Sequence, residues 1–309
     1  MSPRRAAPFA FVEAPLDRAE NLRDDRDALA RLWAGGRTLL LDAEGRARAT
    51  DAGGLLAPKA AALAEGPDDA LFLGLRGDEG WFALREDLLP ADAAAANEGG
   101  RDGGEPARID LRTAAATWPA FEATAFAQAR AVLHWRARHR YCGACGGPLE
   151  YRRAGWLGWG EACSLEHYPR TDPAMIVAVT DGERLLLGRG PGWAPRRFSV
   201  LAGFVAPGES LEQTVAREVF EEASVRVRSS RYLASQPWPF PSSLMLGFEA
   251  EAWPDVPHCP SDELEDARWF TREEVGAALR GESGPDGLQL SPSISISRWL
   301  IERWHDGAR

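Results

Sequence analysis

Five glutamates lie close together in the second half of this 309-residue chain: Glu209, Glu212, Glu218, Glu221 and Glu222. The last three fall in the final turn of a predicted helix, where like charges three or four residues apart repel by about 0.2–0.5 kcal/mol per pair. At about 100° per residue they share one face of that helix. Clustered carboxylates suit Mg²⁺ or Mn²⁺, which in turn bind phosphate oxygens. The cluster therefore predicts metal-dependent handling of a phosphate-containing ligand.

The helix that carries these glutamates has clear local signals. Ser210 and Gln213 match a capping box at its start. Leu211, Val215 and Val219 recur every four residues and predict a buried stripe away from the acidic face. An ordinary charged helix face is the alternative reading of the same pattern.

Three further residues are placed to shape the predicted metal site. Gly203 and Gly208 allow the loop before the helix to turn tightly and to approach a ligand. Arg217 lies four residues before Glu221, so the two side chains can pair and hold that carboxylate in place.

Residues 203–225 resemble the Nudix box in the spacing of the glycine, of Glu209 and of the REVFEE segment at 217–222. Ser224 stands where the family has a glycine that ends the helix in a left-handed turn, and a non-glycine residue there costs about 1–2 kcal/mol. The resemblance implies hydrolysis of a nucleoside diphosphate linked to another group. It also implies an α+β fold, the Nudix α/β/α sandwich with a mixed sheet.

The segment SQPWPFPSSLM at 235–245 resembles a motif of the NADH pyrophosphatase family, whose members also remove NAD caps from RNA. Its prolines stiffen the backbone around Trp238 and Phe240, so these rings can wall a pocket for flat substrates. Gln236 and Ser243 add hydrogen-bonding groups. Without the neighbouring Nudix box, proline-flanked aromatics would more often be packing residues.

Two more segments agree with this family. EHYPRTDPAMI at 166–176 resembles its lead into the Nudix domain, and the resemblance implies that Tyr168 stacks on a substrate ring. Ser297 stands where the family has a small alanine near the substrate. Phe204, the second residue of the Nudix-box segment, is a further aromatic candidate for binding the substrate.

The resemblance also implies a set of catalytic groups. A further catalytic acid falls on Glu263, with Glu265 or Asp266 as alternatives if the register slips. The metal ligands are then Glu218, Glu221, Glu222 and Glu263, with the backbone of Ala202 as an additional donor. One of these glutamates acts as general base on the attacking water. The reaction is NADH or NAD⁺ plus water giving NMNH or NMN plus AMP.

Two other functions remain open on the sequence. Decapping of NAD-capped RNA keeps the chemistry and changes the physiological substrate. A non-catalytic module that senses NAD or nucleic acid needs no full set of glutamates, which speaks against it. The sequence does not rank NADH, NAD⁺, ADP-ribose and diadenosine compounds as substrates.

The cysteines predict an incomplete zinc site. Cys142 and Cys145 form a C-x-x-C half-site, and the family pattern makes Cys163 a third Zn²⁺ ligand, but Gly160 stands where the fourth cysteine is expected. Three other side chains are candidates to complete a tetrahedron: Glu161, His167 and His139. A metal-free ribbon and a redox C-x-x-C are the alternatives. Cys259 is interpreted as a bystander.

Composition limits the class of protein. Asp and Glu outnumber Lys and Arg by 46 to 36, which argues against broad binding to naked nucleic acid. Four cysteines, no signal-peptide pattern and no long apolar run favour a protein of the reducing cytoplasm without a membrane span. The family resemblance implies a homodimer.

Four regions are predicted along the chain. They are a β-rich scaffold (1–115), a linker helix (116–140), a zinc-ribbon-like element (141–170) and the Nudix domain (171–309). Strands are expected over 32–47 and in a hairpin over 71–84, and a surface loop over 91–107.

Overall fold

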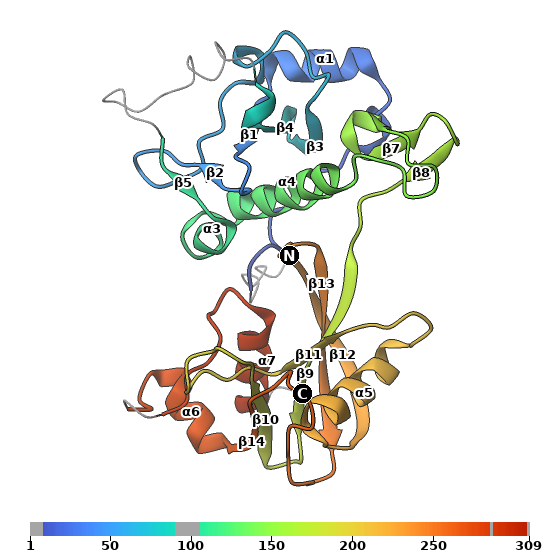
Figure 1. The fold of residues 1–309 in the computed structure, drawn as a ribbon. Helices are drawn as coiled ribbons and strands as arrows, with labels where there is room; N and C mark the ends of the chain where they lie inside the picture. Colours follow the sequence, from blue (N-terminus) through green and yellow to red (C-terminus); the bar gives the residue numbers. More distant parts are fainter. Residues whose placement is uncertain (1–8, 90–105, 285–286, 308–309) are drawn as a thin grey trace. The chain divides into compact units, whose positions relative to one another are not determined.

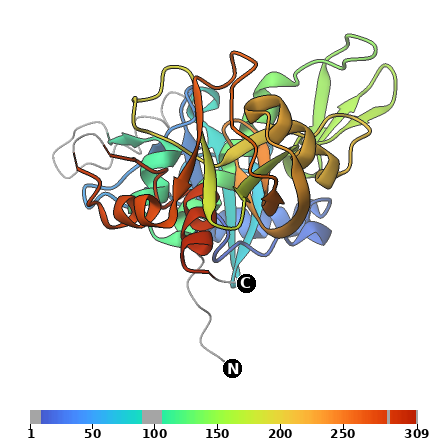
Figure 2. The same cartoon turned by 90° about the horizontal axis from the view of Figure 1, so that it is seen from below.

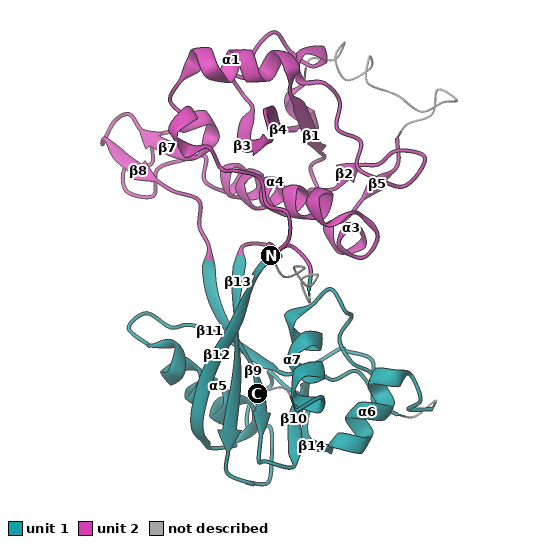
Figure 3. Cartoon of the chain, turned by 180° about the vertical axis from the view of Figure 1, so that it is seen from behind, with its two compact units in different colours: residues 1–9, 172–238, 243–309 teal, residues 10–171, 239–242 magenta. Residues whose placement is uncertain are grey.

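The computed structural model describes residues 9–89, 106–284 and 287–307, and the chain forms two compact units (Figure 3). Unit 1 contains Met1–Phe9, Asp172–Trp238 and Ser243–Arg309. Unit 2 contains Ala10–Thr171 and Pro239–Ser242. The surface loop predicted over 91–107 lies outside the described residues, apart from positions 106 and 107.

Unit 1 is built on a six-stranded mixed sheet with the order β12-β13-β9-β10-β14, and β11 pairs with β9. Its strands are β9 (Asp172–Thr180), β10 (Arg184–Arg189), β11 (Leu201–Phe204), β12 (Val227–Trp238), β13 (Ser243–Ala252) and β14 (Asp266–Thr271). Strands β13 and β9 run parallel, and the other pairs are antiparallel. A short turn that contains Asp181 and Gly182 joins β9 to β10.

Helices cover both faces of this sheet. They are α5 (Leu211–Ala223), α6 (Arg272–Arg280) and α7 (Ile296–His305). Because strand side chains alternate between faces, Met175 and Val177 of β9 pack with Val215 and Val219 of α5, while α7 contacts β9 and β13. Figures 1 and 2 show α5 and α7 on opposite sides of the strands. This is the predicted α/β/α sandwich.

Helix α5 begins and ends as the sequence predicts. The Ser210 hydroxyl accepts from the Gln213 amide at 3.2 Å, and the Gln213 side chain accepts from the Ser210 amide at 2.8 Å. Val215 and Val219 are fully buried. At the other end Ser224 adopts φ 55° and ψ 26°, the left-handed conformation that favours glycine.

Unit 2 contains a five-stranded sheet with the order β3-β4-β1-β2-β5. Its strands are β1 (Arg37–Leu41), β2 (Ala47–Arg48), β3 (Leu71–Arg76), β4 (Glu79–Arg85) and β5 (Arg108–Ile109). Its helices are α1 (Arg26–Gly35), α3 (Leu111–Thr117) and α4 (Ala120–Arg138), with short 3₁₀ helices η1 (Glu20–Leu22), η2 (Ala60–Ala62) and η3 (Glu86–Leu88). The predicted hairpin over 71–84 corresponds to β3 and β4.

The strand prediction over 32–47 is wrong for its first residues. Residues 32–35 belong to helix α1 and not to a strand. Asp25 caps that helix by accepting from the Ala28 amide at 2.9 Å, and Leu29 and Trp33 form its buried side against Phe82. The helical spacing of Leu29 and Trp33 was the signal that the strand interpretation overlooked.

The rest of unit 2 is helix α4 and a small three-stranded antiparallel ribbon, β6-β7-β8. The ribbon consists of β6 (Leu149–Arg152), the 3₁₀ helix η4 (Arg153–Gly155), β7 (Leu157–Gly160) and β8 (Leu165–His167). Helix α4 contacts β1, β3 and β4, so it is part of the core of unit 2. The boundaries at 115, 140 and 170 remain predictions. In the described part of the chain, no helix combines the length and apolar character needed to cross a membrane.

Candidate active site

Three carboxylates converge at one face of helix α5. Glu218, Glu222 and Glu263 each place one oxygen within 4.8 Å of the others. Glu218 and Glu222 share a helix face because they are four residues apart, and Glu263 comes from the segment between β13 and β14. Both helix residues are only 8% exposed, whereas Glu263 is exposed. Two buried acids and one exposed acid therefore face one small space.

Glu222 is the least satisfied member of this cluster. Its Oε2 atom is buried and has no hydrogen-bond partner among the described residues. The pKa of Glu222 is raised to about 8: burial is the main cause, Glu218 and Glu263 contribute in the same direction, and the Ala202 backbone amide acts in the opposite direction. Burial likewise raises the pKa of Glu218. Because an unpartnered buried charge is costly, this donor set fits a divalent cation bound by carboxylate oxygens.

Gly203 makes room for Glu218. A Cβ atom at position 203 would lie 2.0 Å from the Glu218 carboxyl carbon, so no other residue fits there without displacing that carboxylate. Gly203 lies within strand β11 and does not make the tight turn expected of it. Gly208, at φ +94°, makes that turn.

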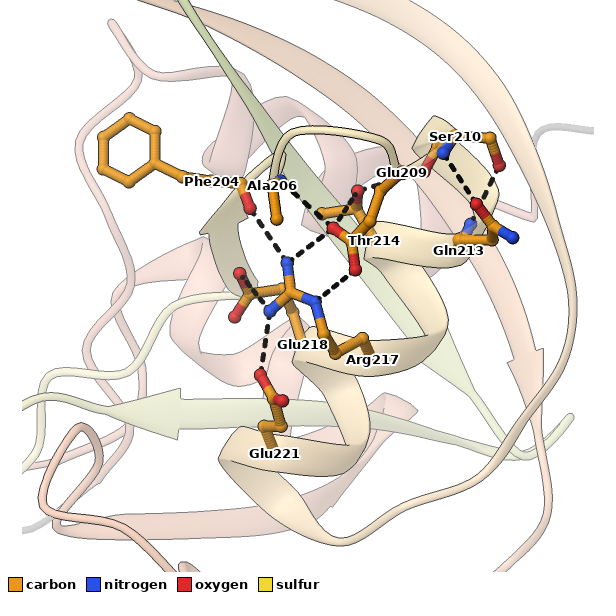
Figure 4. Close-up of polar contacts among 9 residues, drawn as sticks. All are labelled: Phe204, Ala206, Glu209, Ser210, Gln213, Thr214, Arg217, Glu218 and Glu221. Carbon is orange, nitrogen blue, oxygen red and sulfur yellow. Dashed lines mark hydrogen bonds and ion pairs between the residues drawn. The ribbon is translucent and has the colours of Figure 1, made fainter.

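Arg217 connects the loop before α5 with the acidic face (Figure 4). Its guanidinium donates to both oxygens of Glu209 at 2.6 and 2.8 Å, and to Glu221 at 2.8 Å. It also donates to the Phe204 carbonyl at 3.0 Å and lies 3.0 Å from Glu218. The expected pair of Arg217 with Glu221 is present. Glu221 is exposed and bound to Arg217, so it is not grouped with the other three acids.

Glu209 links the loop before α5 to the helix itself. It accepts from the Ala206 amide at 3.1 Å and from the Thr214 hydroxyl at 3.0 Å, in addition to Arg217. The bond to Arg217 is the main reason that the pKa of Glu209 falls to about 2. Glu209 is therefore charged at neutral pH and positions Arg217.

The predicted substrate-binding aromatics occur in both units. Phe204 is 61% exposed at the end of β11, and Trp238 pairs with Ser243 where β12 meets β13. Tyr168, 59% exposed, and Phe240 belong to unit 2. The Arg112 guanidinium lies 4.1 Å from the Phe240 ring centre.

Gln236 is fully buried and ties β12 to the start of α7. Its side-chain amide donates to the Ile294 carbonyl at 2.8 Å, and its carbonyl oxygen accepts from the Ile296 amide at 2.8 Å. These two bonds give Gln236 a structural role in this chain.

Ser297 belongs to a buried cluster of hydroxyls that the sequence did not reveal. Its Oγ lies 2.7 Å from that of Ser199 and 3.3 Å from that of Ser291. The three serines are far apart in sequence and follow no shared periodicity, so only the fold brings them together.

The three ribbon cysteines form a second cluster. The Sγ atoms of Cys142, Cys145 and Cys163 all lie within 4.8 Å of one another, and those of Cys142 and Cys163 are 3.5 Å apart. Hydrogen bonds from the Cys145 and Ala144 backbone amides are the main cause that lowers the pKa of Cys142 to about 6. A low thiol pKa favours the thiolate that metals bind.

His167 is the candidate for a fourth ligand whose contact with a cysteine of the cluster is observed. Its Nε2 lies 3.3 Å from the Cys142 sulfur. His139 lies instead with its Nδ1 3.0 Å from the Trp135 carbonyl oxygen, and Glu161 is exposed. A Cβ at Gly160 would approach the Cys163 sulfur to 3.0 Å, so position 160 borders the same space. Cys259 lies in unit 1, packed against its hydrophobic core.

Comparison with known proteins first defines the class. The family described as NUDIX domain matches residues 169–289, which include α5 and Glu263. The family described as NADH pyrophosphatase-like rudimentary NUDIX domain matches residues 30–135. The second match covers most of the predicted β-rich scaffold (1–115) and most of the predicted linker helix (116–140), where no chemical motif marks the sequence.

Individual relatives give a narrower assignment. The NAD-capped RNA hydrolase NudC of Mycobacterium bovis is 40% identical over 296 residues, which cover 93% of this chain and 92% of that protein. The NAD-capped RNA hydrolase NudC of Stutzerimonas stutzeri is 48% identical over 169 residues, covering 54% of this chain and 56% of that protein. A crystal structure of a Nudix hydrolase from Nitrosomonas europaea is 22% identical with a TM-score of 0.43, covering 55% of this chain and 92% of that chain. The chain belongs to the NADH pyrophosphatase (NAD-capped RNA hydrolase) family of Nudix hydrolases.

Proposed function

We propose that this protein hydrolyses the pyrophosphate bond of NADH or NAD⁺ to NMNH or NMN plus AMP, with Mg²⁺ or Mn²⁺ bound at the carboxylate cluster. The observation that supports this most directly is the close approach of Glu218, Glu222 and Glu263, one of which has a buried oxygen with no hydrogen-bond partner among the described residues. Three repelling acids are held together at a cost that a bound cation offsets.

The residues of the site have different roles in this proposal. Glu218 and Glu222 are held in place by burial and act as metal ligands. Glu263, from the segment between β13 and β14, is the third ligand of the cluster. Glu221 and the Ala202 carbonyl are further donors to the same ions. Divalent ions bound there neutralise the diphosphate and make an attacking water more acidic. An exposed carboxylate, Glu263 or Glu221, accepts the proton from that water.

Arg217 is a positioning residue in this proposal. It fixes Glu221 through one nitrogen and is itself held by the two hydrogen bonds that it donates to Glu209. Tyr168 contacts a substrate ring, as the family resemblance implies, and the other aromatic candidates for ring contacts are Phe204, Trp238 and Phe240. Ser243, Gln236 and Ser297 are further substrate-binding proposals, although the last two already have protein partners.

A second candidate activity is removal of the NAD cap from RNA. The observation that favours it is that the relatives above are named NAD-capped RNA hydrolases. The same carboxylates would cut the same bond, so the chemistry does not distinguish the two substrates. Comparing kcat/KM for free NADH with that for NAD-capped RNA separates them.

We further propose that Cys142, Cys145, Cys163 and His167 bind one structural Zn²⁺. Three soft sulfurs and one imidazole are a common tetrahedral donor set for this ion. The contact between His167 and Cys142 supports His167 over the other two candidates. The homodimer implied by the family and the cytoplasmic location expected from the composition belong to the same proposal, and light scattering of the purified protein tests the dimer.

The activity test uses purified protein with Mg²⁺ or Mn²⁺ and a panel of NADH, NAD⁺, ADP-ribose and diadenosine compounds. We expect AMP release from NADH, no release with chelator, and loss of turnover in Glu222→Gln. Glu212→Gln is the matched control, because Glu212 is exposed on the same helix and outside the cluster. AMP release that survives in Glu222→Gln would contradict the assignment of the ligands.

A further inference from the structure

Unit 2 contains a cavity whose lining is rich in arginine. Its volume is about 590 Å³, and it lies among the start of α1, the end of α4 and the β6–η4 part of the ribbon. Five arginines line it: Arg23, Arg26, Arg136, Arg152 and Arg153. Only three carboxylates do so, those of Asp24, Asp68 and Glu150. A local excess of positive charge is unexpected in a chain whose net charge is −10.

Arg23 is nearly buried and only partly satisfied. It is 9% exposed, and its guanidinium lies 4.1 Å from the centre of the Trp156 ring, which holds it in place. One terminal nitrogen reaches the exposed Glu20 at 3.3 Å. Its Nε atom is buried without a hydrogen-bond partner among the described residues. An unsatisfied buried donor of this kind calls for an explanation, and a nearby bound anion is one.

Unlike Arg23, the arginines at positions 26 and 136 have no acidic partner among the described residues. Arg136 donates to the Asp69 carbonyl at 3.3 Å and lies 4.6 Å from the centre of the Tyr151 ring. In the part of the chain that the structure describes, neither Arg136 nor Arg26 lies within ion-pair distance of a carboxylate. Arg152 and Arg153 are paired, with Glu150 at 2.8 Å and with Asp24 at 3.3 Å.

The electrostatics agree with this geometry. Burial lowers the pKa of Arg136 and is also the largest cause that lowers the pKa of Arg23. Arg153 and Arg18 lower the pKa of Arg23 further, although Glu20 opposes them. Positive charge is thus held in a partly desolvated space where cations repel one another. A bound anion would offset both the free-energy cost of burying these charges and their mutual repulsion.

We propose that this cavity binds a nucleotide through its phosphate groups, either as a free nucleotide or as part of an RNA chain. Guanidinium groups match phosphate oxygens with two parallel hydrogen bonds, which favours phosphate over a simple inorganic anion of lower charge. A volume near 590 Å³ lies within the range of small-molecule sites, about 300–1,000 Å³. The proposal does not depend on the reaction at the carboxylate cluster, because no residue is shared.

The test measures equilibrium binding of two probes to the full chain carrying Glu222→Gln, which prevents turnover. The probes are ATP and a fluorescent 5′-phosphorylated RNA tetranucleotide. The test variant adds Arg26→Ala and Arg152→Ala, both at exposed positions of the lining. We expect roughly tenfold or greater loss of affinity, and for RNA a salt-dependence slope reduced by about 1.4.

The matched control removes the same charge from the same unit. Arg31 of α1 and Arg138 of α4 are exposed and lie outside the cavity lining. We expect Arg31→Ala with Arg138→Ala to keep parental affinity for both probes. The single variant Arg26→Ala serves as the second test if loss of Arg152, which lies 4.7 Å from the Trp159 ring centre, disturbs the ribbon.

The two probes distinguish the sources of the phosphate. Binding of ATP as tightly as RNA assigns the cavity to a free nucleotide, and much tighter binding of RNA assigns it to a nucleic acid chain. No binding of either probe, or equal losses in the test and control variants, would overturn the proposal. In a turnover-competent background, kcat/KM for NADH is expected to be unchanged by the cavity variants, so failure here is separable from failure of the proposed reaction.

Discussion

Glu222→Gln is expected to stabilise the metal-free protein while it abolishes metal binding. In the folded chain the pKa of Glu222 is raised to about 8 from an ordinary value of 4.5. Below about pH 4.5 the folded and unfolded states both hold the proton, so this group makes no difference. Between these two pKa values only the folded state holds it, so stability falls as pH rises. Glutamine resembles the protonated acid and removes that loss.

The magnitude follows from the two pKa values. At pH 7 the difference of about 2.5 units between pH and the unfolded pKa corresponds to about 3 kcal/mol, since one unit is about 1.36 kcal/mol. We take this as an upper value because the cluster relaxes when its charges repel. Glu212→Gln is expected to change stability by less than about 0.5 kcal/mol at the same pH, because surface substitutions are usually small.

The assay is urea unfolding of the full chain in chelator at several pH values, followed by the same titration with saturating Mn²⁺. The transition that Mn²⁺ shifts identifies unit 1, because ligand binding stabilises only the folded state that binds it. We expect Glu222→Gln to be more stable than the parent in chelator, with a gain that grows from pH 5 to pH 8. In Mn²⁺ the order reverses. A variant less stable than the parent in chelator at pH 8 would refute the reasoning.

Four other variants test individual contacts. Gly203→Ala should displace Glu218 and weaken Mn²⁺ binding by about 10-fold or more; unchanged affinity by calorimetry would show that the strand moves instead. Arg217→Lys loses the two-bond contact with Glu209 and should lower kcat for NADH by about 10-fold while unfolding stability changes little, which steady-state kinetics beside urea unfolding measures. His167→Ala should lower zinc retained after chelator dialysis, measured by mass spectrometry, whereas His139→Ala should not. Ser224→Gly should change stability by less than about 1 kcal/mol, because relief of the left-handed strain is offset by backbone entropy, and a larger urea-measured loss would implicate the Ser224–His258 contact.

Local pattern was sufficient for helix α5 and its surroundings. The capping box at Ser210 and the buried stripe of Val215 and Val219 depend on residues within one helix, where spacing determines which side chains meet. The same rule predicted the pair of Arg217 with Glu221. Sequence spacing therefore predicted the start and the buried face of the helix that carries the carboxylates. The left-handed end at Ser224 was instead expected from the resemblance to the Nudix box.

Contacts between residues of different elements could not be predicted from local spacing. Helical spacing places Glu221 on the acidic face, but Arg217 binds it, so Glu221 lies outside the cluster that the structure brings together. Gly203 was interpreted as a turn residue because glycine often marks a turn. In the structure it is a glycine that leaves room for the Glu218 side chain. The proximity of His167 to Cys142 likewise depends on how the ribbon strands pair.

The contacts of Gly203 and Arg217 also explain why the box residues occur at such wide spacing. Strand β11 supplies Gly203 beside Glu218, and the following loop supplies Glu209 to hold Arg217. Each contact joins a residue before the helix to a residue one or two turns inside it, so the strand, loop and helix must keep fixed lengths. A repelling set of acids needs such rigid support, because any slack would let the side chains separate and the space for a cation would be lost. The spacing of the motif is thus set by the support of the carboxylates as much as by the carboxylates themselves.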